Sequence, residues 1–131
     1  MAAQPGTAAG KIAASFGFAP VCGESARILI LGSLPGQTSL HRREYYAQPQ
    51  NSFWRIMGAL FGAGPNLSYA ERVQRLIAAA LYARHVAGRL APRDAQIRRE
   101  RLPSTSPAHA SVCFDAKLAA WRAFVRLAKS A

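Results

Sequence analysis

Arg27-Ile28-Leu29-Ile30-Leu31-Gly32-Ser33-Leu34-Pro35-Gly36 is the stretch that decides the fold of this chain. Its run of large aliphatic residues predicts a strand that is buried on both faces, as in a parallel sheet. Pro35 and Gly36 fit neither a strand ladder nor the start of a helix, so a sharp turn is expected there. In open α/β folds, ligands bind at the carboxyl ends of such strands. The stretch therefore predicts an α/β fold with a pocket at this turn.

A second informative segment runs from Pro49 to Trp54, after a polar loop that contains the tyrosine pair Tyr45-Tyr46. The apolar residues that follow recur at helical spacing and predict a helix from about Ser52 to Phe61. Asn51 or Ser52 is placed to cap that helix. The expected buried stripe consists of Phe53, Ile56, Met57 and Leu60. Amide donors, a polar cap and an aromatic ring would thus surround one strand end.

The remaining segments predict one domain over residues 16–131, preceded by a poorly ordered lead-in over residues 1–15. Ser68 and Glu71 form a capping box, which predicts a helix that runs into the eighties and ends at Gly88 or Pro92. Its expected buried face consists of Val73, Leu76, Ile77 and Leu81. Asp115 is placed to cap a last helix, whose expected stripe consists of Leu118, Trp121, Val125 and Ala128.

Composition narrows the class of protein. The chain has 131 residues, of which 50% are hydrophobic, enough for one compact core. No apolar run approaches the ~20 residues that span a bilayer, and no signal peptide is recognised, so a cytoplasmic protein without membrane contact is expected. Cys22 and Cys113 lie far apart without metal-ligand spacing. They are interpreted as reduced thiols rather than a disulfide, and no metal site or cofactor is predicted.

The formal net charge of +11 favours a polyanionic partner such as DNA, because phosphate contacts release condensed counterions. An arginine-rich composition without such a partner would give the same charge. Arg42, Arg43, Arg98 and Arg99 are candidates for phosphate contacts. For the run that ends at Arg101, a solvated charged face is the alternative interpretation.

Two blocks of sequence resemble the hypoxanthine-DNA glycosylases, a branch of the uracil-DNA glycosylase superfamily. The first contains Gly32 to Gly36, Ser39-Leu40, Tyr45-Tyr46 and Pro49 to Trp54. The second contains Leu102 to Ala110, followed by Lys117 to Trp121. The resemblance covers roughly half of the chain and keeps both blocks in the family's order. It implies a three-layer α/β sandwich with a parallel sheet.

The resemblance implies a monofunctional enzyme, acting as a monomer, that hydrolyses the N-glycosidic bond of hypoxanthine or uracil in DNA during base-excision repair. Such an enzyme flips the nucleotide into a pocket and stabilises charge on the sugar and on the departing base. The first loop, consisting of Gly32, Ser33, Leu34, Pro35 and Gly36, would contribute backbone amides and close approach to the base. Leu34 stands where related mismatch-type enzymes carry an asparagine that orients the attacking water.

Several side chains have both a functional and a structural interpretation. Asn51 is the candidate for water positioning or base contact, or else a helix cap. Phe53 would stack on the extruded base, or else be a core aromatic. Tyr46 would close one wall of the pocket. His109 would hydrogen-bond the oxygen on which leaving-group charge develops, or else be an exposed loop residue.

The second loop also contains two serines, and a departure from the family lies just before it. Ser104 and Ser106 would hold phosphate or shape the loop. Family members carry a further strand and helix before this loop, whereas residues 80–101 here form an Arg/Ala-rich tract. The expected sheet is therefore reduced or incomplete, unless a short segment such as residues 112–114 pairs with the first strand.

The sequence is compatible with three functions. The first is the glycosylase itself, and the second is a catalytically impaired homologue that only binds nucleic acid through its basic surface. The third is a small basic nucleic-acid-binding module with chance similarity. Because no strand is recognised beneath the second loop, weak excision is expected.

Overall fold

The computed structural model describes residues 18–24, 26–32, 35–79, 81–85 and 100–130. Its elements, in chain order, are β1 (Ile28–Gly32), α2 (Gln37–Arg42), α3 (Phe53–Phe61), α4 (Tyr69–Ala78), β2 (Leu81–His85) and α5 (Phe114–Lys129). Several sequence predictions lie outside the described residues. They are the lead-in at residues 1–15, Ser33, Leu34, Gly88, Pro92, Arg98 and Arg99.

The described sheet has two parallel strands, β1 and β2, with Ile28 opposite Leu81 and Gly32 opposite His85. The helix after Ser68, α4, ends at Ala78, so the prediction that it runs into the eighties is wrong. Leu81 was assigned to that helix but lies in β2, where it is 1% exposed. Pairing with β2 satisfies one row of β1 peptide groups, which an extended helix would have left without partners.

The segment at residues 112–114 does not pair with β1, so that suggestion is also wrong. Cys113 is the N-cap of α5, and Phe114 is the first residue of the helix. Asp115 lies in the first turn rather than at the cap, which corrects the predicted cap position. An acidic side chain there still favours the helix, because it faces the positive end of the helix dipole.

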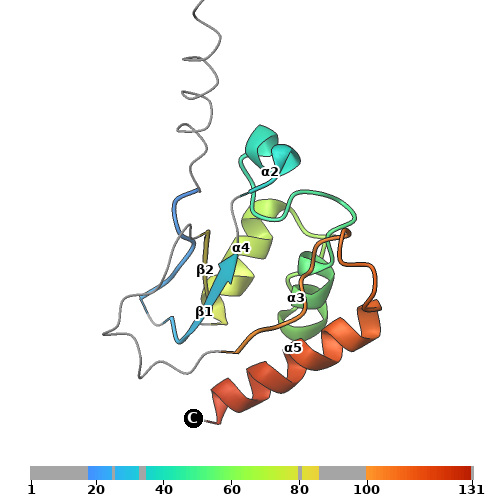
Figure 1. Ribbon diagram of the computed structural model, residues 1–131. Helices are drawn as coiled ribbons and strands as arrows, with labels where there is room; N and C mark the ends of the chain where they lie inside the picture. The colour runs from blue at the N-terminus through green and yellow to red at the C-terminus, as the bar shows by residue number, and fades with distance from the viewer. Residues whose placement is uncertain (1–17, 25, 33–34, 80, 86–99, 131) are drawn as a thin grey trace, which may run out of the picture.

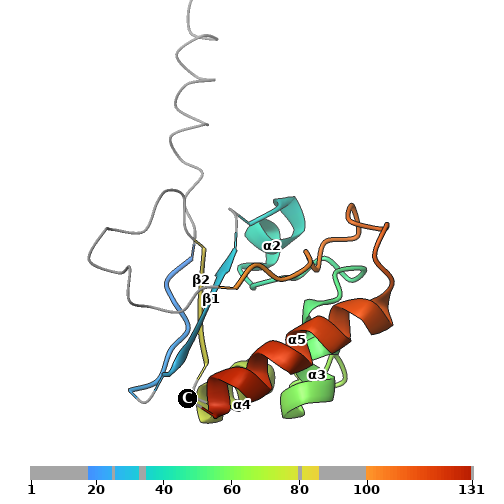
Figure 2. The same ribbon diagram turned by 60° about the horizontal axis from the view of Figure 1, so that its bottom comes forward.

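Helices α3, α4 and α5 lie on one side of the two strands (Figures 1 and 2). The described residues thus form one helical layer against one sheet, and the third layer of the predicted sandwich is not among them. The prediction that β1 is buried on both faces is wrong. Ile28 is 8% exposed, whereas Leu29 and Leu31 are 38% and 40% exposed. The alternation follows the two-residue period of a strand that packs on one face.

The core lies between this helical layer and the sheet. In α3, Phe53, Ile56 and Met57 are buried and Leu60 is half-buried, which confirms the predicted helix and its stripe. The capping box is also confirmed, since the Ser68 hydroxyl accepts a hydrogen bond from the Glu71 amide and the Glu71 carboxylate accepts one from the Ser68 amide.

The turn after α3 brings two glycines into backbone contact. Gly62 ends the helix in the left-handed conformation, with φ 72°. A Cβ added at Gly58 would lie 2.7 Å from the Cα of Gly64, which is closer than such atoms approach. The chain can therefore fold back tightly here because both residues lack a side chain.

Candidate functional site

The first loop leads from β1 into a short helix. Pro35 is half-buried and Gly36 is exposed. Gly36 is the N-cap of α2, and its carbonyl accepts a hydrogen bond from the Leu40 amide at 3.0 Å. The segment after Gly36 was predicted to be a loop, so α2 is a correction. Thr, Ser and His in α2 have weak helix propensity, which explains why the pattern gave no signal.

A cluster of aromatic rings follows α2 and extends into α3. The Tyr46 and Phe53 rings stack with centroids 3.8 Å apart and planes 18° apart. Phe53 also makes edge contacts with Trp54 and Trp121. The Trp54 indole donates to the Tyr45 carbonyl at 2.9 Å. These contacts join the tyrosine pair to the start of α3 as one packed unit.

Phe53 is 1% exposed, so its ring lies in the core in this conformation. A flipped base could reach it only if the Tyr46 ring moved aside. The base-stacking role of Phe53 therefore stays a prediction, and the neighbouring Tyr46 is the ring that closes its face.

Tyr46 has two unusual properties for a loop tyrosine. Its φ of 53° lies in the left-handed region, which costs energy for a side chain of this size. Burial, together with the nearby Tyr45 hydroxyl, raises the pKa of Tyr46 from 10.0 to about 12. The phenol therefore stays protonated and can act as a hydrogen-bond donor throughout the physiological pH range.

Asn51 lies immediately before the α3 N-terminus and is half-buried. Its side-chain Oδ1 accepts a hydrogen bond from the Phe53 amide at 2.9 Å. The Ser52 side chain, by contrast, caps nothing. Asn51 thus satisfies the first amide of the helix, as the structural interpretation predicted. The side-chain Nδ2 donors and a second lone pair on Oδ1 are not used by this bond.

The second loop, residues 104–109, is shaped by its own side chains. The Ser104 hydroxyl accepts from the Ser106 amide, and the Ser106 hydroxyl accepts from the Ala108 amide, both at 3.2 Å. The His109 amide donates to the Ser106 carbonyl at 3.0 Å. The His109 side chain is exposed. Both serines therefore shape the loop, which was one of their two predicted roles.

The second loop meets the end of the first block at the N-terminus of α3. The Ser52 amide donates to the Thr105 carbonyl at 2.9 Å. Figure 1 shows residues 100–113, in orange, beside the upper end of α3. Asn51 is adjacent to the residue that makes this bond, and Ser106 is adjacent to its partner. The structure thus brings together the two blocks that the sequence keeps far apart.

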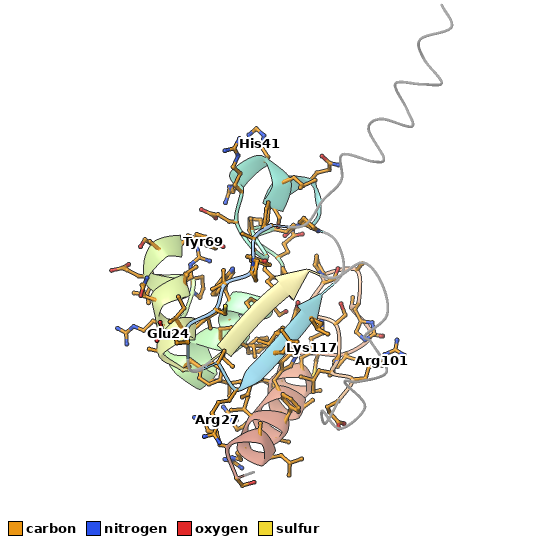
Figure 3. The ribbon with its side chains drawn as sticks, turned by 90° about the vertical axis from the view of Figure 1, so that its left-hand side faces the viewer. Glu24, Arg27, His41, Tyr69, Arg101 and Lys117 are labelled. Carbon is orange, nitrogen blue, oxygen red and sulfur yellow. The ribbon has the colours of Figure 1, made fainter. Side chains whose placement is uncertain are left out.

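The basic candidates are divided between described and undescribed segments. Arg42 and Arg43 are exposed at the end of α2, where Arg43 has a φ of 55°. Arg101 is also exposed, and Figure 3 labels it together with His41 of α2. These side chains are exposed and can reach a phosphate. That they contact DNA phosphates stays a prediction.

Sequence reasoning missed two basic residues at the start of α5, one in contact with it and one within it. The Arg55 guanidinium lies 3.9 Å from the centre of the Phe114 ring, linking α3 to the start of α5. Lys117 in α5 is 4% exposed. The spacing of Lys117, Trp121 and Val125 was a usable signal, since the three share one helix face.

The described residues contain no cluster of three or more potential metal ligands. Among the described helices, none has the length and apolar character needed to cross a bilayer. A surface hollow lies along α4 and is lined by Leu67, Ala70, Glu71, Gln74 and Arg75. None of these is a predicted site residue.

Comparisons with known proteins point to one family. No family model matches the chain. It is 44% identical to the hypoxanthine DNA glycosylase of Methanosarcina barkeri over 61 residues, which cover 46% of this chain and 39% of the relative. It is 39% identical to the hypoxanthine DNA glycosylase of Methanosarcina acetivorans, with the same coverage of both chains.

A solved structure supports the same relationship. The solution NMR structure of a candidate uracil DNA glycosylase from Methanosarcina acetivorans superposes with a TM-score of 0.50 at 32% identity. The match covers 66% of this chain and 56% of the other. The chain thus spans only part of the length of these relatives. Over the matched stretch the chain is therefore similar, in sequence and in fold, to hypoxanthine and uracil DNA glycosylases of Methanosarcina.

Proposed function

We propose that this protein is a monofunctional DNA glycosylase that hydrolyses the N-glycosidic bond of deaminated bases, hypoxanthine or uracil, in DNA. The observation that carries the proposal is the hydrogen bond between the Ser52 amide and the Thr105 carbonyl. It places Asn51 and the second loop on the same end of α3. The protein would act in base-excision repair, in the cytoplasm, as a monomer without metal or cofactor.

The reaction breaks the bond between the sugar C1′ and a base nitrogen. The bonding electrons leave with the base, so negative charge develops on the base and positive charge on the sugar. The oxygen of a water molecule then bonds to C1′, and the proton it loses balances the proton gained by the base. Donors aimed at the base and an acceptor that orients the water lower the barrier.

Asn51 is the proposed catalytic residue of the first block. Its Oδ1 is held by the Phe53 amide, which fixes the plane of the carboxamide. The second lone pair of Oδ1 can orient water, and the two Nδ2 hydrogens can bond a base oxygen or nitrogen. His109 is the proposed donor of the second block, because its exposed imidazole can bond a base oxygen.

DNA binding would rest on the charge of +11. We propose phosphate contacts by Arg42 and Arg43 at the end of α2, and by Arg98 and Arg99. Backbone groups of Gly32, Ser33, Leu34, Pro35 and Gly36, with Tyr46, Ser104 and Ser106, would surround the base. Phe53 would stack on the base after displacement of the Tyr46 ring. Affinity for duplex DNA should fall steeply as salt rises and depend little on sequence. A flat salt response would remove DNA as the partner.

Replacing Asn51 by Ala and by Asp tests the catalytic assignment. N51A removes every side-chain hydrogen bond, so single-turnover release of hypoxanthine or uracil should fall about 10²-fold or more. N51D keeps an acceptor for the Phe53 amide but loses the Nδ2 donors. If N51D has low activity and unchanged stability, the catalytic role of Asn51 belongs to its Nδ2 donors. If N51D keeps high activity, the catalytic role belongs to the oxygen that positions water.

Asn66 provides a matched control for this experiment, because it is exposed in the turn between α3 and α4. N66A and N66D should release base as fast as the parent. Equal rates for N51A and the parent, with measurable release in both, would refute the catalytic role of Asn51. Absence of release in the parent would instead refute the proposed activity.

A second function, nucleic-acid binding without catalysis, is favoured by two observations. Phe53 is buried beneath Tyr46, and Glu100 to Pro103 before the second loop form no strand. A chain of this type would show salt-dependent DNA binding but no base release. Grafting a family-like segment between Arg101 and Leu102 would then restore release.

A further inference from the structure

Lys117 is the most deeply buried charged residue among the described side chains. It is 4% exposed, in the first turn of α5, and is labelled at the upper end of that helix in Figure 3. Lys129, in the last turn of the same helix, is exposed. Burial of an ammonium group is costly unless it is paired and hydrogen-bonded.

The described surroundings of Lys117 offset little of that cost. Its Nζ makes one long hydrogen bond, 3.5 Å to the Ser106 carbonyl. No ion pair with a described carboxylate is present. The positive end of the α5 dipole opposes the charge as well. Lysine is almost never fully buried unless its ammonium group has a partner, so the one polar partner of Lys117 indicates where its role lies.

The Ser106 carbonyl connects Lys117 to the proposed site. The same oxygen accepts a hydrogen bond from the His109 amide at 3.0 Å, which closes the turn that carries the imidazole. One residue earlier, the Thr105 carbonyl accepts a hydrogen bond from the Ser52 amide. The second loop is therefore held from two sides, by the α3 terminus and by Lys117. No described strand leads directly into it.

We propose that Lys117 is a positioning residue for the second loop. Its charge attracts the dipole of the Ser106 carbonyl and so fixes the turn that carries His109. Lys117 touches neither DNA nor base in this role. The inference rests on the proposed function only in its effect on catalysis, because the positioning itself can be measured without activity.

The test compares K117M with K129M in the full chain. Both changes remove one positive charge from α5, so they lower the overall attraction to DNA equally. Amide exchange of His109 and Ala108 should become about tenfold faster in K117M, the scale of a hydrogen bond to a charged group. Exchange of the Ile56 amide within α3 should stay unchanged, as should all three amides in K129M.

Catalysis provides the second readout. The single-turnover rate of hypoxanthine or uracil release should fall about tenfold or more in K117M, because small misplacements of a catalytic group are costly. The dissociation constant for duplex DNA should match that of K129M. A loss of rate without a loss of affinity separates positioning from DNA contact.

The outcomes separate the two proposals. Unchanged His109 exchange in K117M would overturn the positioning role, whatever the activity. Faster exchange in a chain whose parent releases no base would support the positioning role and refute the proposed function. A loss of DNA affinity beyond that of K129M would mean that Lys117 contacts DNA directly, which also overturns the proposal.

K117Q is the second variant if K117M does not fold, since it keeps a hydrogen-bond donor without the charge. In the unaltered chain, reductive methylation with formaldehyde should modify Lys117 at least tenfold more slowly than Lys129. Equal reaction rates would overturn the proposal. Failure of both variants to fold would show that Lys117 supports the core rather than the loop, and would overturn it as well.

Discussion

The two blocks of the candidate site are held in place by different means. Residues 39–54 of the first block are packed: Ser39, Tyr45 and Phe53 are all buried, and the aromatic rings contact one another. The second loop, residues 104–109, is largely exposed and is held by hydrogen bonds within the loop and by the bond from the Ser52 amide to the Thr105 carbonyl. Residues 39–54 are thus the packed half of the site and belong to the core. The second loop is the attached half and is joined to the core by hydrogen bonds.

This difference separates stability from catalysis. A change in the first block alters the core and the site together, so its effect on base release is difficult to interpret without a stability measurement. A change in the second loop should leave the free energy of unfolding nearly constant. The second loop is therefore the better place to test chemistry, and the first block the better place to test packing.

The largest expected contrast is between F53A and H109A. F53A should lower the free energy of unfolding by about 3–5 kcal/mol, because it removes a buried ring and leaves a cavity. H109A removes an exposed side chain and should change the free energy of unfolding by less than ~0.5 kcal/mol. Urea denaturation measures both. Similar values for the two variants would contradict the division into a packed and an attached half.

A second contrast comes from pH. Burial raises the pKa of Tyr46 to about 12 in the folded chain, against 10.0 ordinarily. The Tyr46 phenol therefore holds its proton more tightly in the folded state than in the unfolded state. The resulting contribution to the free energy of unfolding is complete below pH ~10 and is lost as pH rises toward ~12. It amounts to roughly 2–3 kcal/mol.

The measurement compares melting temperatures of the parent and Y46F between pH 8 and 11.5. Phe cannot ionise, so Y46F should lose less stability over the alkaline part of this range. Parallel pH profiles for the two proteins would show that the Tyr46 phenol is not protected in the packed half.

The smallest expected contrast uses two serines that accept the same kind of bond. The Ser39 hydroxyl accepts from the Ala47 amide at 3.0 Å and is buried, whereas the Ser104 hydroxyl accepts from the Ser106 amide and is exposed. S39A should cost about 1–3 kcal/mol, because a buried amide loses its partner. S104A should cost less than ~0.5 kcal/mol, because water replaces the hydroxyl. Equal costs in thermal denaturation would argue that burial does not distinguish the two blocks.

The sequence predicted the elements whose local pattern agrees with their tertiary environment. The β1 aliphatics, the α3 stripe and the Ser68 capping box each carry a strong local signal, and each is present in the structure. The β2 strand was missed because Leu81-Tyr82-Ala83-Arg84-His85 has no aliphatic run, and pairing with β1 decides its conformation. The end of α4 was misplaced for the same reason.

The candidate site was predicted in its parts but not in its connections. The meeting of Asn51 with the second loop depends on the Ser52–Thr105 bond, which involves only backbone atoms and leaves no sequence signal. The burial of Lys117 was missed because a lysine in a helix is ordinarily exposed. The stacking of Tyr46 on Phe53 requires a left-handed tyrosine, which no residue pattern indicates.

The contact between Gly58 and Gly64 limits how the chain can change in length. Because the backbone of α3 touches the turn that follows it, an insertion between the two glycines would bring a residue with a Cβ to the contact point. Insertions should therefore be tolerated poorly between residues 58 and 64. They should be tolerated better at the exposed residues Pro65 and Asn66, just beyond the contact. A tag or reporter peptide intended to leave the fold intact would accordingly be placed between Pro65 and Asn66.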